Sequence, residues 1–225
     1  MSKDWSLVID ENKLKCLLGE IKERFGCELV WHTKLSPPSS DRGDVTTHGF
    51  LDFEVPTSDE LKQEIRRWVE SEGWQFSRQF VECSLSAGRP IEYIYLAPMI
   101  PVALDVGYHA TRRVLLESIR QDGLLPSTPE RQTTERADCE GNIYVCEQLG
   151  TPTDAGVRGS KSAHWWCDRL AKKNRFNDPD WVILRVEVGK VAGLRAYRDI
   201  WSESGVIVDG VARIPPELVR LEYPI

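Results

Sequence analysis

Hydrophobic positions in the first hundred residues follow the order helix, strand, strand, and then repeat that order. Asn12–Gly26 has apolar side chains at helical spacing, and Thr57-Ser-Asp-Glu60 has the capping-box pattern that opens a second helix ending at Gly73. Four further runs have strand patterns, at 27–32, 49–55, 74–85 and 91–96. This order predicts a compact α+β domain over residues 1–98 that recognises a substrate or partner, or supports the rest of the chain.

Residues 99–225 contain more strand patterns and fewer helical ones. The run Gly107–Leu124 predicts a short strand ending at His109, followed by a helix that stops at Gly123 in a left-handed cap. A second helix is expected from Ser160. Further strands are predicted at 142–146, 181–188, 194–200, 205–208 and 219–223. Because strands and helices do not alternate, and because the chain has no Gly-x-Gly-x-x-Gly motif, the fold class is α+β and not a Rossmann fold.

Composition narrows the class of protein. The chain has 225 residues, a hydrophobic share of 41% and a formal net charge of −6, which argues against a general coat protein for nucleic acid. The six cysteines form no Cys-x-x-Cys pair, so free thiols and no metal site are expected. There is no signal-peptide pattern and no apolar run near the ~20 residues of a membrane helix, which predicts a cytoplasmic protein without membrane contact.

His109 is the first candidate for a functional side chain. It closes a predicted strand just before a helix, where it is well placed to face a ligand. The alternative is a histidine that is hydrogen-bonded within the fold. In residues 1–98 no catalytic constellation is found, since His32 and His48 do not have the spacing of a metal pair. The tryptophans there are interpreted as core residues and not as a stacking surface.

Four motifs in residues 100–225 resemble the catalytic domains of the ADP-ribosyltransferase superfamily. Tyr108-His-Ala-Thr with Asp122-Gly-Leu124 resembles the first motif of poly(ADP-ribose) polymerase-like domains. Glu140-Gly-Asn-Ile-Tyr-Val-Cys146 and Gly159-Ser-Lys-Ser-Ala-His-Trp165 are similar to their second strand and following helix start. The last strands, from Gly205-Val-Ile-Val-Asp onward, also resemble those of RNA 2′-phosphotransferases. The resemblance implies an ADP-ribosyltransferase-like split β-sheet domain over 99–225, with NAD as substrate and no metal.

The resemblance also implies roles for single residues around NAD. His109 would hold the ribose next to nicotinamide through its 2′-hydroxyl, and the backbone of Ala110 would pair with the nicotinamide carboxamide. Thr111, the next motif residue, belongs to the same binding group. Tyr144 and Trp165 would stack on the nicotinamide ring, whereas ordinary core packing is the alternative for both. Ser162 would hydrogen-bond the carboxamide oxygen.

The catalytic carboxylate is the least determined part of the resemblance. Counting back from Asp209 without a gap, the family's glutamate position falls on Ser204, and Glu203 is one residue earlier. A one-residue bulge would bring Glu203 to the site, and a solvated loop residue is the alternative. In the family, a carboxylate at this position supports chain elongation. Whether Glu203 or Ser204 occupies the position, we expect transfer of a single ADP-ribose and no polymer.

Together these features predict an NAD-dependent mono-ADP-ribosyltransferase that releases nicotinamide and modifies a macromolecular acceptor, protein or nucleic acid, in a toxin or defence setting. The alternatives are an RNA 2′-phosphotransferase-like enzyme, a catalytically degenerate NAD- or ADP-ribose-binding module, and an interaction protein that shares only the fold. One stretch, 158–175, carries six basic residues and one acidic residue. It is either a solvated helix face with a basic end or a surface that follows phosphates.

Overall fold

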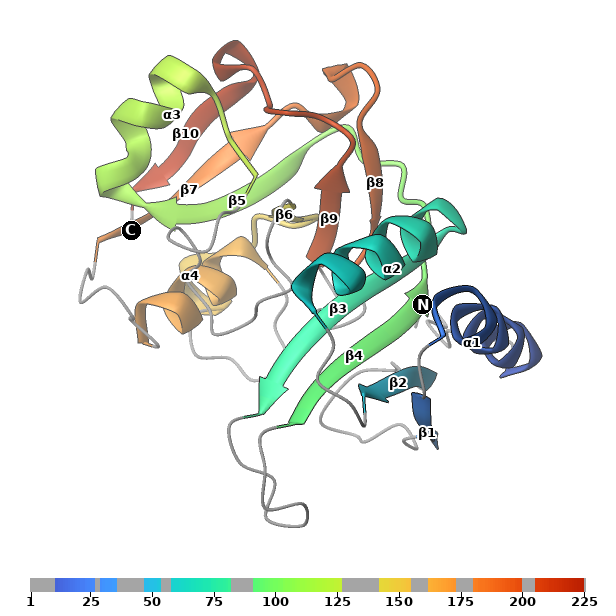
Figure 1. Cartoon of the computed structure of the whole chain (residues 1–225). Helices are drawn as coiled ribbons and strands as arrows, with labels where there is room; N and C mark the ends of the chain where they lie inside the picture. Colours follow the sequence, from blue (N-terminus) through green and yellow to red (C-terminus); the bar gives the residue numbers. More distant parts are fainter. Residues whose placement is uncertain are drawn as a thin grey trace. The chain divides into compact units, whose positions relative to one another are not determined.

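The computed structural model of the chain describes residues 11–26, 29–35, 47–53, 58–81, 91–126, 142–154, 162–172, 180–199 and 205–224. The chain divides into two compact units with the border between Met99 and Ile100. The sequence placed this border one residue earlier. Figure 1 shows the elements of the two units.

The first unit has the element order predicted from the sequence. It consists of α1 (Glu11–Phe25), β1 (Leu29–Leu35), β2 (Thr47–Phe53), α2 (Asp59–Ser71), β3 (Trp74–Val81) and β4 (Ile91–Pro98). The strands form one antiparallel sheet in the order β1-β2-β4-β3. The apolar stripes of the two helices are buried, through Leu14, Leu17, Leu18 and Ile21 in α1 and through Ile65 and Val69 in α2.

Two boundaries in this unit differ from the sequence prediction. The N-cap of α2 is Ser58, whose hydroxyl accepts the backbone N–H of Leu61 at 3.2 Å, so the predicted capping box from Thr57 to Glu60 is wrong by one residue. The hairpin of β1 and β2 pairs Leu29 with Phe53 and continues to Leu35 and Thr47, beyond the strand patterns predicted at 27–32 and 49–55. Backbone pairing extends there through polar residues because a ladder does not require apolar side chains.

The second unit contains a six-stranded antiparallel sheet and few helices, so the predicted α+β class is confirmed. Its strands are β5 (Gly107–Arg112), β6 (Ile143–Cys146), β7 (Trp181–Val186), β8 (Arg195–Arg198), β9 (Gly205–Asp209) and β10 (Val219–Pro224), in the order β10-β7-β5-β6-β9-β8. The α-helices described in this unit are α3 (Leu116–Asp122) and α4 (Ala163–Lys172).

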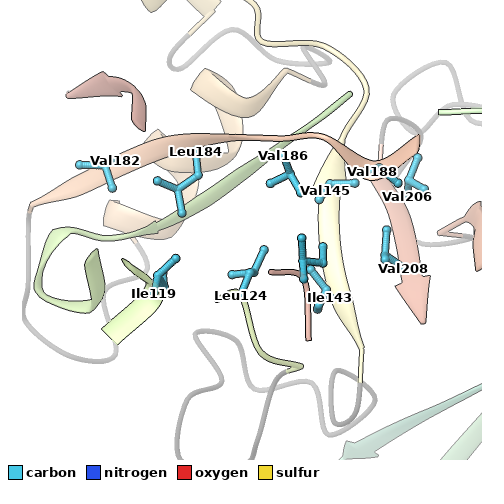
Figure 2. Packing of buried hydrophobic residues seen from close by; sticks show 11 residues of the cluster. Ile119, Leu124, Ile143, Val145, Val182, Leu184, Val186, Val188, Val206 and Val208 are labelled. Carbon is cyan, nitrogen blue, oxygen red and sulfur yellow. The ribbon is translucent and has the colours of Figure 1, made fainter. Parts of the chain in front are cut away.

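Each face of this sheet has its own hydrophobic cluster. On one face, Val182, Leu184 and Val186 of β7 pack with residues of β6 and β9 and with Ile119 of α3, as Figure 2 shows. On the other face, Trp181, Ile183 and Cys146 pack with Ala163 and Cys167 of α4. We call these the α3 face and the α4 face. Burial on both faces explains the almost unbroken apolar run of β7.

The motif around His109 is built differently from the expectation. β5 does not end at His109 but continues to Arg112, because β7 pairs with it as far as Trp181. A 3-10 turn, Arg113–Leu115, then leads into α3. Gly123 caps α3 with a positive φ of 83°, but its ψ of −175° is extended and not left-handed helical. A Cβ at Gly123 would lie 2.2 Å from the carbonyl oxygen of Ile214. Only glycine therefore fits where these two backbone segments approach each other.

Candidate functional site

The six-stranded sheet is joined at its centre by a single residue pair. β5 pairs with β7 over all six of its residues, but it pairs with β6 only through Tyr108 and Cys146. The sheet therefore consists of two three-stranded halves, β10-β7-β5 and β6-β9-β8, that meet at this junction. Beyond it, the edge of β5 from His109 to Arg112 has no strand partner among the described residues. We call this stretch the open edge. Backbone groups that point out of a strand edge can pair with a ligand as they would with another strand.

His109 connects the two halves just beyond the junction. Its Nδ1 lies 2.7 Å from the backbone carbonyl oxygen of Tyr144. A carbonyl only accepts, so Nδ1 carries the proton and donates. Burial lowers the pKa of His109, against the smaller raising effect of this hydrogen bond. The ring is therefore neutral at physiological pH and its Nε2 has a free lone pair. His109 is therefore hydrogen-bonded within the fold, which was the alternative to a ligand contact. No described residue forms a hydrogen bond with its Nε2.

Tyr144 and His109 leave their strands on opposite faces of the sheet. His109 pairs with Leu184 of the α3-face cluster, which sets the face of His109. Ile143 and Val145 also belong to that cluster, so Tyr144 between them points toward the α4 face and is half-buried. The two residues approach each other through the Tyr144 carbonyl and not ring to ring. A ligand that contacts both rings must therefore lie across the open edge and not on one face.

Ser162 is the N-cap of α4 and is 2% exposed. Its Oγ accepts the backbone N–H of Trp165 at 3.3 Å. The first two N–H groups of the helix donate to the segment after β6, from Ala163 to Gln148 at 2.9 Å and from His164 to Leu149 at 3.3 Å. The helix begins at Ala163 and not at Ser160 as predicted, because the cap and this segment fix its start. Ser162 thus has a structural task, whatever else its hydroxyl binds.

Three further predicted residues, Trp165, Ala110 and Thr111, lie on α4 and on β5. Trp165 is half-buried and packs edge-on against Trp166, with ring centroids 4.9 Å apart, while Trp166 packs against the α4-face cluster. Ala110 and Thr111 lie on the open edge of β5, where they pair with Ile183 and Val182 on the other side.

Glu203 and Ser204 lie outside the described residues. The chain on either side of them is described, since the N–H of Asp199 donates to the carbonyl of Gly205 at 2.9 Å, and Gly205 pairs with the junction residue Cys146. The basic stretch 158–175 is described only in part, and its basic side chains lie outside what is described.

Three polar residues near the site were missed by sequence reasoning. Asn142, directly before β6, is buried, and so is His164 of α4, whose pKa is lowered by burial against the raising effect of Asp154. Glu147, directly after β6, is bound by both guanidinium nitrogens of Arg198, one of them at 2.9 Å. Alternation along 142–146 placed Asn142 on the face of Tyr144, which was the available signal. Nothing in the sequence pairs Glu147 with Arg198, 51 residues away.

Neither a family model nor a curated protein matches this chain. In the part of the chain that is described, no group of three or more acidic, histidine or cysteine side chains is placed to hold a metal ion. Among the described helices, none has the length and apolar character needed to cross a membrane.

Proposed function

We propose that the second unit is an ADP-ribosyltransferase-like domain and that the protein is an NAD-dependent mono-ADP-ribosyltransferase acting on a macromolecular acceptor. The observation that carries this proposal is the junction of the split sheet. There a neutral histidine donates to the Tyr144 carbonyl at 2.7 Å beside an edge of β5 that no described strand covers. Described residues of all four family-like motifs lie at this junction or pack next to it.

The open edge suits the nicotinamide carboxamide. A primary carboxamide has an oxygen acceptor and N–H donors, the same groups that a neighbouring strand would offer. It can therefore pair with the outward N–H and C=O of β5 near Ala110 as a short extra strand does. The ring would then lie in the plane between the two sheet halves. In that position it is reached by His109 from the α3 face and by Tyr144 from the α4 face.

His109 has the protonation state that ribose binding requires. With the proton on Nδ1, its Nε2 accepts a hydrogen bond from a ribose hydroxyl. This fixes the sugar without placing a positive charge next to the oxocarbenium-like centre that forms as the bond to nicotinamide breaks. A protonated imidazole would raise the energy of that centre. The lowered pKa of His109 therefore favours the proposed reaction.

In the proposed reaction the C1′–N bond of NAD breaks and its electron pair neutralises the pyridinium, which leaves as nicotinamide. The acceptor nucleophile forms the new bond to C1′ and releases its proton to a base. Tyr144 and Trp165 supply aromatic surface for the nicotinamide ring, and the cap by Ser162 orients the first turn that carries Trp165. Glu203 is the proposed carboxylate near the sugar. We propose transfer of one ADP-ribose and no polymer.

The test is incubation of the purified chain with labelled NAD and cell lysate, followed by nuclease or protease treatment of separate aliquots. We expect nicotinamide release together with label in one macromolecular fraction. His109→Ala should lower the rate by about 100-fold or more, because sugar placement is lost. Gln121→Ala, on the exposed surface of α3, is the control and should keep full activity.

Three outcomes would contradict the proposal. NAD binding without nicotinamide release would indicate a binding module. Loss of phosphate from a 2′-phosphorylated RNA would indicate the phosphotransferase reaction. If the chain neither binds NAD nor releases nicotinamide, NAD has no part in its function.

A further inference from the structure

The backbone carbonyl of Tyr144 points toward β5, across the gap between the two sheet halves. In an antiparallel ladder, alternate residues direct their N–H and C=O groups to alternate neighbouring strands. The N–H of Asp199 donates to the carbonyl of Gly205 at 2.9 Å, so Gly205 faces β8 and the next residue, Val206, faces β6. Val206 pairs with Val145, so Val145 faces β9 and the residue before it, Tyr144, faces β5.

The backbone of Ala110 points toward the same gap from the other side. Cys146, two residues after Tyr144, also faces β5, where it forms the junction pair with Tyr108. By the same alternation, Ala110 faces β6 as Tyr108 does. If the ladder continued past the junction, its next hydrogen-bonded pair would be Ala110 and Tyr144. Among the described residues that pair does not form, because the pairing of β5 with β6 stops at the junction.

The imidazole of His109 reaches the carbonyl that a closed ladder would pair with Ala110. Its Nδ1 lies 2.7 Å from the oxygen of Tyr144 and donates to it. Paired strands lie about 4.7–4.9 Å apart. A donor on a side chain extends further from β5 than a backbone N–H does, so it can bond this oxygen across a wider gap. The hydrogen bond of His109 therefore satisfies the Tyr144 carbonyl while the strands stay apart.

We propose that His109 is a positioning residue that keeps β5 and β6 apart beyond the junction, and so keeps the backbone of Ala110 open to the carboxamide of nicotinamide. The identity of this ligand rests on the proposed function, whereas the spacing of the strands concerns the protein alone. The role is separate from the ribose contact, since it uses Nδ1 and the ribose contact uses Nε2. Without the Nδ1 donor, Ala110 and Tyr144 pair and close the site.

Hydrogen exchange of the Ala110 amide, followed by NMR without ligand, tests the spacing. His109→Ala should slow this exchange by about fivefold or more, the equilibrium effect of one net hydrogen bond. His109→Leu, which retains apolar volume without a donor, should do the same and replaces His109→Ala if that variant does not fold. His109→Asn retains an N–H donor near Nδ1 and should exchange within about twofold of the wild type. A bond that merely held the strands together would give the opposite sign, since its loss would speed exchange.

The affinity for free nicotinamide, measured by NMR titration, tests what the open site binds. A ligand that binds only the open form loses affinity in proportion to the fraction of that form. His109→Ala should therefore weaken nicotinamide binding by about the same factor by which it slows Ala110 exchange, and His109→Asn should restore it. Free nicotinamide has no ribose, so the loss of Nε2 does not contribute. Gln121→Ala, on the exposed surface of α3, is the control and should change neither measurement.

Each measurement can overturn its part of the inference. Exchange of Ala110 as fast as in the wild type, or faster, in both His109→Ala and His109→Leu would overturn the spacing role. Slower exchange with unchanged nicotinamide affinity would overturn the assignment of the ligand to Ala110. If the wild-type chain binds no nicotinamide, the proposed function fails, and the exchange rates still decide whether His109 keeps the strands apart.

Discussion

Gly150 and Ser162 are in direct contact, although one follows β6 and the other caps α4. A Cβ built on Gly150 would lie 2.2 Å from the Cβ and 2.3 Å from the Oγ of Ser162. The same Cβ would lie 2.2 Å from Oδ2 of Asp154, which accepts the backbone N–H of Thr151 at 2.8 Å. The segment after β6 is thereby held against the start of α4, the helix that carries Trp165.

Substitution of Gly150 should therefore destabilise the second unit by more than backbone strain alone. Gly150 has a φ of 72° and Gly193 has a φ of 77°, but a Cβ at Gly193 would contact nothing within 4 Å. Gly193→Ala should cost about 1 kcal/mol, as an alanine at positive φ does. Gly150→Ala should cost about 2–4 kcal/mol, because overpacking is added. Urea unfolding of both variants measures the difference. Equal losses of unfolding free energy would show that the segment after β6 shifts at little cost to accommodate the Cβ.

Acid should destabilise the fold partly through His109. Its pKa is lowered by burial, so between that value and 6.5 the unfolded chain binds a proton that the folded chain does not. Stability is then unaffected above pH 6.5 and falls below it, by up to about 1.4 kcal/mol per pH unit. His109→Asn retains an N–H donor near Nδ1 but does not titrate. The stability of this variant relative to the wild type should therefore improve from pH 7.5 to pH 5.5.

Urea unfolding at these two pH values provides the test. His164→Asn should have a similar effect, since burial lowers the pKa of His164 as well. A constant difference between wild type and His109→Asn at both pH values would mean that the ring is protonated in the folded protein.

The ion pair of Glu147 and Arg198 should be worth more than an exposed one. Its side chains are 27% and 15% exposed, and both guanidinium nitrogens bind the carboxylate. The side chains of Arg113 and Asp180 are 39% and 48% exposed and lie 2.7 Å apart, from Nε to Oδ2. Double-mutant cycles with alanine should give a coupling of about 1–3 kcal/mol for the first pair and below about 1 kcal/mol for the second. A first value no larger than the second would show that desolvation cancels the contact.

Thiol reactivity should distinguish the three described cysteines. Burial raises the pKa of the Cys167 thiol to about 12, and burial, with Cys167 nearby, raises that of Cys146 further. Cys16 is exposed on α1. Because the thiolate is the reactive form, iodoacetamide at pH 8 should label Cys16 within minutes and leave the other two unmodified in the native state. Peptide mass spectrometry gives the extent at each cysteine. Labelling of Cys146 at the rate of Cys16 would show that the junction opens.

Hydrophobic patterning alone predicted the element order of the first unit and the α+β class of the second. Both properties depend on local periodicity and on buried stripes such as Leu14 to Ile21. The boundaries were less accurate where pairing overrides pattern. β5 extends past His109 because its last residue, Arg112, pairs with Trp181 of β7, which lies 69 residues further along the chain. The sequence around β5 does not include this pairing partner, so the local pattern could not predict the end of the strand.

For the candidate site, the residue types were readable from the sequence, but their arrangement was not. His109, Tyr144 and Ser162 were identified from motifs, and the role in NAD binding remains a proposal. The tertiary structure decided that His109 meets the backbone of Tyr144 and that Ser162 is buried as a cap. These relationships arise from how β5 and β6 meet at one residue pair and then cease to pair. Such a contact depends on register and twist across the sheet, which no short segment of sequence specifies.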